Sequence, residues 1–90
     1  MAGRELSKEY WAWRKAVVKR DGGKCQFPNC KRRGKEVHHI INWCYSASLR
    51  FEVSNGIFLC KRCHYSIKGK ENMYAEMFRT VIAQQKNKKK

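Results

Sequence analysis

Three short stretches decide how this chain folds: CQFPNC at 25–30, VHHI at 37–40 and LCKRCH at 59–64. The first and the last each carry a close pair of cysteines, and about thirty residues separate the two pairs. Two short-spaced cysteine pairs are typical of a closed, tetrahedral zinc site with no open coordination position. We therefore predict one structural zinc ion, held by four thiolates: Cys25, Cys30, Cys60 and Cys63.

A metal site matters here because the chain has only 90 residues. A single domain of this length has a marginal core, and a metal ion is a common supplement. Zinc binding is worth roughly 10–16 kcal/mol in small zinc peptides and acts as folding free energy. The alternative is that one cysteine pair is only buried. Cys44 lies too far from either pair to join them, so we expect it to be a buried or half-buried free thiol.

The charge of the chain points to a polyanionic partner. Lysine and arginine number 21 against 7 acidic residues, which gives a net charge of +14. Such an imbalance suits nucleic acid and argues against a neutral small-molecule substrate, although it also favours solubility. No apolar run approaches the ~20 residues of a transmembrane helix, so we expect no membrane partner. Residues 1–8 show no secretion signal, and we therefore expect reduced cysteines and a cytoplasmic location.

Apolar spacing and turn residues predict a mixture of helices and short strands. Ser7 is a suitable cap for the first helix, and Gly22-Gly23 a suitable end. The pattern predicts three helices and two strands: helices at 8–20, from 60 or 61 to 69 and at 71–84, with strands at 36–41 and 57–59. We expect the apolar stripe of the last helix to belong to the core and to pack on the first helix.

All three histidines lie beside or within the cysteine-framed stretches. Successive residues on a helix point about 100° apart, so if Cys63 faces the zinc ion, His64 must face elsewhere. On a regular strand His38 and His39 would point to opposite faces, yet they can flank one phosphate if the strand ends there. Phosphodiester hydrolysis needs this division of labour: a divalent cation neutralises charge, and a histidine deprotonates the attacking water.

These segments resemble the signature of the HNH endonucleases: Val37-His38-His39-Ile40, Asn55-Gly56-Ile57 and Leu59-Cys60-x2-Cys63-His64. The resemblance covers roughly residues 18–67. The chain resembles most the subgroup with a four-cysteine zinc site, which is common among phage, intron-encoded and restriction-type nucleases. The resemblance implies an α+β fold: a small ββα-metal finger with a flanking N-terminal helix and a C-terminal helix.

Chain length predicts one domain. Together with the resemblance, we expect the whole of 1–90 to form a single HNH nuclease domain, in the host-cell cytoplasm if a phage encodes it. The expected parts follow in order: an N-terminal basic helix (1–24), the zinc knuckles and the ββα finger (25–69), a C-terminal helix (70–85) and a basic tail (86–90).

Matched position by position, the resemblance implies a role for each signature residue. His38, which is Asp in many relatives, would be the first metal ligand, and His64 the second. His39 would be the general base. Asn55 would brace the loop and orient that base, although Asn-Gly also favours a type I′ turn. Imidazole ligands tolerate several metals whereas magnesium prefers oxygen, so the resemblance implies a divalent catalytic cation such as Mn²⁺, Mg²⁺, Ni²⁺ or Zn²⁺ without selecting one.

The sequence therefore predicts a metal-dependent DNA endonuclease that nicks or cuts both strands. The alternative is a non-catalytic, zinc-stabilised DNA-binding module, which explains the charge well but the histidines badly. A chain this short is also compatible with a homodimer or with a phage or host protein partner. The candidate DNA contacts are all basic residues, which could equally form a solvated face: Arg50, implied by the resemblance, and Arg14, Lys15, Lys19 and Arg20 of the first helix.

Overall fold

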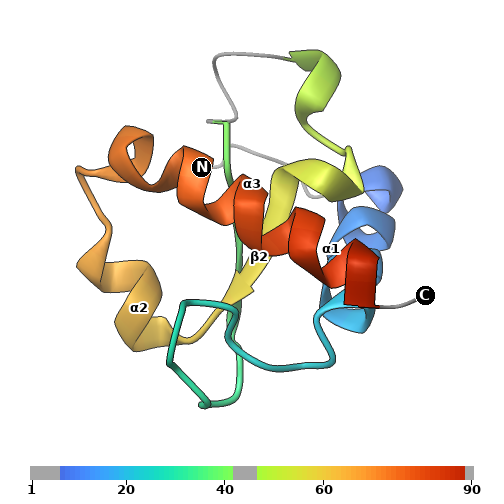
Figure 1. Cartoon of the computed structure of the whole chain (residues 1–90). Helices are drawn as coiled ribbons and strands as arrows, with labels where there is room; N and C mark the ends of the chain where they lie inside the picture. Colours follow the sequence, from blue (N-terminus) through green and yellow to red (C-terminus); the bar gives the residue numbers. More distant parts are fainter. Residues whose placement is uncertain (1–6, 42–46, 89–90) are drawn as a thin grey trace.

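The computed structural model describes residues 7–41 and 47–88. Its elements follow one another in this order: helix α1 (Lys8–Arg20), strand β1 (Glu36–His39), the 3₁₀ turns η1 (Ala47–Leu49) and η2 (Val53–Asn55), strand β2 (Gly56–Leu59), and helices α2 (Lys61–Ser66) and α3 (Glu71–Lys88). The two strands form one antiparallel sheet, with helices around it (Figure 1). The predicted α+β fold, a small finger with flanking helices, is confirmed.

The register of the two strands gives the sheet two different faces. His38 pairs with Ile57, and His39 with Gly56. Because side chains alternate along a strand, neighbouring residues of each strand contribute to opposite faces. One face carries Phe58, which joins a cluster with Trp13 and Val17 of α1. The other face carries a larger cluster of buried residues, with contributions from both later helices: Cys25, Ile40, Ile57, Leu59, Cys60, Ile67, Phe78 and Ile82.

The expectation that the last helix packs on the first is therefore wrong. The apolar stripe of α3 contacts the Ile57 face of the sheet, whereas α1 covers the Phe58 face. Figure 1 shows α3 passing across β2. The physical reason is that this two-stranded sheet is apolar on both faces, so each face needs its own cover. Spacing along α3 identifies its buried side but not the surface against which that side packs.

A buried carboxylate joins α1, β2 and α3. Asp21 accepts hydrogen bonds from the backbone N–H of Phe58 at 2.9 Å and from the side chain of Gln85 at 3.0 Å. The guanidinium of Arg20 donates to both oxygens of Asp21 at 2.8 and 2.9 Å. It also donates to the carbonyl oxygens of Val53 at 2.9 Å and Gly56 at 2.7 Å. Because a buried charge is tolerated when it is paired and fully hydrogen-bonded, this network fixes the sheet on α1.

The observed element bounds agree with the prediction for α1 and differ elsewhere. The side chain of Ser7 accepts from the backbone N–H of Tyr10 at 3.2 Å, which caps the helix as expected. The last helix is longer than predicted: its backbone stays helical to Lys88, through most of the expected tail. Conversely, α2 ends at Ser66 and β1 at His39, both earlier than predicted. Cys44 lies outside the described residues.

Candidate functional site

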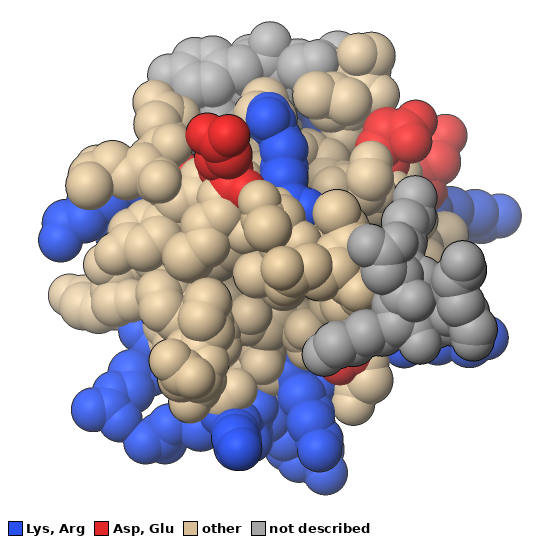
Figure 2. All heavy atoms as spheres, viewed as in Figure 1, with Lys and Arg blue, Asp and Glu red and all other residues tan. Residues whose placement is uncertain are grey.

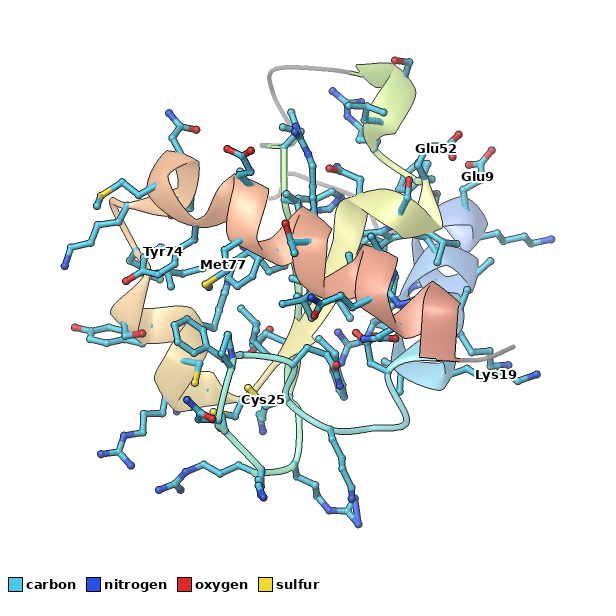
Figure 3. The ribbon with its side chains drawn as sticks, viewed as in Figure 1. Glu9, Lys19, Cys25, Glu52, Tyr74 and Met77 are labelled. Atoms are coloured by element: carbon cyan, nitrogen blue, oxygen red, sulfur yellow. The ribbon has the colours of Figure 1, made fainter. Side chains whose placement is uncertain are left out.

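The four paired cysteines meet at one point. Their Sγ atoms all lie within 4.8 Å of one another, and the Sγ atoms of Cys30 and Cys60 are 3.9 Å apart. A tetrahedral zinc ion with Zn–S bonds of ~2.3 Å would place its sulfurs about 3.8 Å apart. All four are free thiols, and Cys25 and Cys60 are buried. Figure 3 shows Cys25 close to the end of β2. The cluster could therefore hold a structural metal ion, and its geometry fits zinc.

Local backbone structure explains why each pair converges. In the first pair, the N–H of Cys30 donates to the carbonyl of Phe27 at 3.0 Å, and Asn29 adopts a left-handed conformation with φ of 68°. In the second pair, Cys60 caps α2, and its Sγ accepts from the N–H of Cys63 at 3.4 Å. A tight turn thus directs each pair of thiols to the same side.

The surroundings of the four thiols favour the binding of a cation. Burial raises the pKa of Cys25 and the pKa of Cys63. Burial also acts to raise the pKa of Cys60, but the backbone N–H of Cys63 and the neighbouring thiols lower it to about 7. Four crowded thiolates repel one another, and a divalent cation removes that repulsion because coordination deprotonates thiols outright.

His38 and His64 form a second, separate group on the α2 and α3 side of the sheet. Their ring centroids are 5.5 Å apart, and the ring of His38 lies 5.7 Å from that of Phe78. His38 is only 7% exposed, and its Nε2 atom is buried without a hydrogen-bond partner. A buried polar atom left unpaired costs about 1–3 kcal/mol. A metal ion is a partner that such a nitrogen accepts.

Both of these histidines are held in the neutral form that a metal ligand needs. Burial, together with the nearby His64, lowers the pKa of His38 to about 4, against the weaker opposing effect of Glu71. Burial likewise lowers the pKa of His64. A neutral imidazole presents a nitrogen lone pair, so this pair suits a divalent cation at neutral pH.

His39 points the other way, toward α1, as the alternation of a strand predicts. Its ring stacks on Trp13, with centroids 4.2 Å apart and planes at 18°. Its Nε2 lies 2.9 Å from the carbonyl oxygen of Arg50. A carbonyl can only accept, so Nε2 carries the hydrogen and the lone pair of the neutral ring sits on Nδ1. The ring is thus fixed in orientation and in tautomer, which is what a general base requires.

A family model described as HNH endonuclease matches residues 23–70. The chain belongs to the HNH endonuclease family. The matched segment contains both cysteine pairs, all three histidines and Asn55. No curated protein and no solved structure matches the chain. None of the described helices of this HNH protein has the length and apolar character needed to span a bilayer.

Asn55, the middle residue of the HNH signature, braces a loop and does not form a type I′ turn. Gly56 has φ of −121°, which excludes that turn, and Asn55 instead ends η2. The buried Asn55 side chain accepts from the N–H of Ile41 at 2.8 Å. It donates to the carbonyls of Ile41 and Leu49, both at 3.2 Å. Leu49 precedes Arg50, so this bracing holds the carbonyl that orients His39.

The basic residues expected to contact DNA have different surroundings. Lys15 and Lys19 are exposed on α1. Arg14 is half-buried and donates to the carbonyl of Lys35 at 3.2 Å. Arg20 uses its guanidinium within the fold, so we assign it a structural role. Arg50 contributes its carbonyl to the site, and its role as a phosphate contact stays a prediction.

Sequence reasoning missed two features near the site. The stacking of Trp13 on His39 joins residues far apart in sequence, and no spacing rule connects them. The second feature is an exposed basic surface over the first cysteine pair and α2. A signal for it was present, because residues 22–35 contain 5 lysines and arginines and no acidic residue.

Because His38 is buried in its neutral form, its protonation gives a testable prediction about pH. Its pKa falls from 6.5 to about 4 on folding, so between these values the unfolded chain binds the proton and the folded protein does not. Its contribution to stability is therefore complete above pH 6.5 and is lost as the pH falls through 4. An NMR titration of the His38 ring, without an added catalytic cation, should give a midpoint near 4. A midpoint near 6.5 would contradict the buried, neutral ligand.

Proposed function

We propose that this HNH protein is a metal-dependent DNA endonuclease that hydrolyses phosphodiester bonds. The observation that carries the proposal is the unpaired, buried Nε2 of His38, whose ring lies 5.5 Å from the ring of His64. Directly beside it in sequence, but on the other face of β1, lies a histidine held in one tautomer. These positions support a ligand pair and a base around the end of one strand.

The division of labour follows from these contacts. His39 accepts the proton of the attacking water on Nδ1, while the Arg50 carbonyl and the Trp13 ring keep the imidazole in place. Asn55 acts as a positioning residue, because it holds the loop that carries the carbonyl. His38 and His64 would hold the catalytic cation. A divalent cation bound there would neutralise charge on the scissile phosphate and on the leaving oxygen.

The two proposed metal sites have different tasks. Four thiolates close a tetrahedral site, so zinc at the cysteines would be structural. Two imidazoles leave several coordination positions for water and phosphate oxygens, which suits catalysis. Imidazole ligands favour Ni²⁺ or Zn²⁺ and are accepted by Mn²⁺, whereas Mg²⁺ prefers oxygen. We therefore expect Mn²⁺ or Ni²⁺ to support more cleavage than Mg²⁺.

The alternative function is a zinc-stabilised DNA-binding module without catalysis. It accounts for the cysteine cluster and for the net charge of +14. It gives no reason to bury a histidine nitrogen without a partner, or to fix the tautomer of the neighbouring histidine. Cleavage of supercoiled plasmid by the parent protein separates the two functions, with nicked and linear products measured separately across the four cations.

Removing the second proposed ligand should change the metal requirement. In His64→Ala, plasmid cleavage should fall, and the remaining activity should need more Mn²⁺ because one of two protein ligands is gone. The measurements are cleavage rate against Mn²⁺ concentration and Mn²⁺ binding followed by electron paramagnetic resonance. The matched control is Asn72→Ala, an exposed substitution on α3 that should keep the parent's curve. Unchanged Mn²⁺ dependence in His64→Ala would remove His64 from the metal site.

A further inference from the structure

A group of exposed positive charges lies at one end of this protein. Seven exposed lysines and arginines belong to the segment 24–35 around the first cysteine pair and to the start of α2: Lys24, Lys31, Arg32, Arg33, Lys35, Lys61 and Arg62. No acidic residue occurs in 22–35 or in 56–66. Figure 2 shows lysine and arginine side chains gathered along the lower edge of the molecule. Glu9 and Glu52 lie at the opposite end from Cys25 in Figure 3.

This surface contains a groove, and the groove has the composition of a nucleic-acid site. It has a volume of about 710 Å³ and lies between residues 32–35 and the start of α2. Five of the seven cations line it, together with Tyr65, which is 74% exposed. A Cβ atom on Gly34 would collide with the Phe58 ring, so the chain there must be glycine to pack this closely. Cations around an exposed aromatic ring are the combination that binds single-stranded nucleic acid.

The walls of the groove are neighbours, in sequence, of the proposed catalytic residues. One wall immediately precedes β1, which carries His38 and His39. The other wall is α2, where Tyr65 follows His64 and points about 100° away from it. Lys35 is three residues from His38, about 10 Å along a strand.

We propose that this groove, and not the outer face of α1, binds the DNA strand next to the cleaved bond. Its cations contact phosphates, and Tyr65 stacks on a base. Stacking needs an unpaired base, so the preferred substrate is DNA with a single-stranded segment close to the cut. The position of the groove next to the cleaved bond rests on the proposed nuclease function. The binding itself does not depend on that function and is measured separately.

The test compares two double variants that remove the same charge. Arg33→Gln/Arg62→Gln acts in the groove, and Lys15→Gln/Lys19→Gln acts on α1. Affinity for single-stranded DNA is measured by fluorescence anisotropy over a range of salt, with zinc-loaded protein and no added catalytic cation. The groove variant should reduce the salt slope by up to ~0.7 for each lost phosphate contact, and the α1 variant should change it little. An equal or larger change in the α1 variant would overturn the proposal.

Tyr65 tests the stacking separately. Tyr65→Ala should weaken binding of single-stranded DNA about 5- to 100-fold and leave affinity for blunt duplex almost unchanged. Tyr65→Phe should retain the parent's affinity, because the ring remains. Equal losses on duplex and single-stranded DNA, or no loss on either, would contradict stacking on an unpaired base. A parent that binds through the groove but never cuts would confirm the groove and refute the nuclease.

Discussion

His39→Gln should lose most plasmid cleavage while it keeps DNA binding. A positioned general base accelerates a reaction by ~10²–10⁴-fold, and glutamine cannot take up the proton. Glutamine is the sharper replacement because its amide can still donate to the Arg50 carbonyl, as Nε2 of His39 does at 2.9 Å. His39 contacts neither the thiols nor His64 in the described contacts, so zinc content should also be unchanged. The measurements are single-turnover cleavage, DNA affinity and zinc content.

His39→Ala is the useful companion variant. It removes the stacking on Trp13 as well as the base, so it should lower the thermal midpoint slightly more than His39→Gln does. Cleavage should fall equally in both, because both lack the base. A His39→Gln protein that cuts at the parent's rate would show that the base is misassigned. His38 would then be the first residue to test in its place.

Cys60→Ser should lose both the zinc ion and cooperative unfolding. Cys60 is buried, caps α2 and lies 3.9 Å from the Sγ of Cys30, so it connects the two halves of the cluster. Zinc at such a site contributes roughly 10–16 kcal/mol of folding free energy in small peptides, which is at least comparable to the roughly 5–15 kcal/mol by which whole domains are stable. Zinc content by mass spectrometry and thermal unfolding by circular dichroism are the measurements.

Cys44→Ser is the matched control for the zinc site. It makes the same chemical change at the one cysteine that spacing excludes from the cluster, so zinc content and the thermal midpoint should stay at the parent's values. The account of the zinc site fails if Cys60→Ser melts like the parent and still holds one zinc ion. It fails equally if Cys44→Ser loses the ion.

The cysteine cluster and α1 were predictable because their signals are local. Cysteine spacing within each pair is short, and the tetrahedral ion requires the two pairs to meet. Ser7 and the glycines at 22–23 mark the ends of α1, and the helix forms between them as predicted. Strand alternation also predicted that His38 and His39 face opposite ways. Each of these signals lies within a few neighbouring residues of the sequence.

Features that depend on tertiary contacts were not predictable in the same way. The apolar stripe of α3 identified a buried side but not its partner, the Ile57 face of the sheet. Asn55-Gly56 predicts a turn by local preference, yet the hydrogen bonds of Asn55 to Ile41 and Leu49 override it. Arg20 looked like a surface cation, but the buried Asp21 recruits it. Trp13 stacks on His39 only because the sheet packs against α1.

The most direct test of the central claim is cleavage of supercoiled plasmid by the zinc-loaded parent protein, with and without added Mn²⁺. DNA binding is confirmed in the same samples, so an inactive protein can be distinguished from an unbound one. The account predicts nicked or linear product that appears with Mn²⁺, is absent without it, and disappears in His39→Gln. Bound plasmid that stays supercoiled with Mn²⁺, Ni²⁺, Zn²⁺ and Mg²⁺ alike would contradict it and would leave the non-catalytic DNA-binding module.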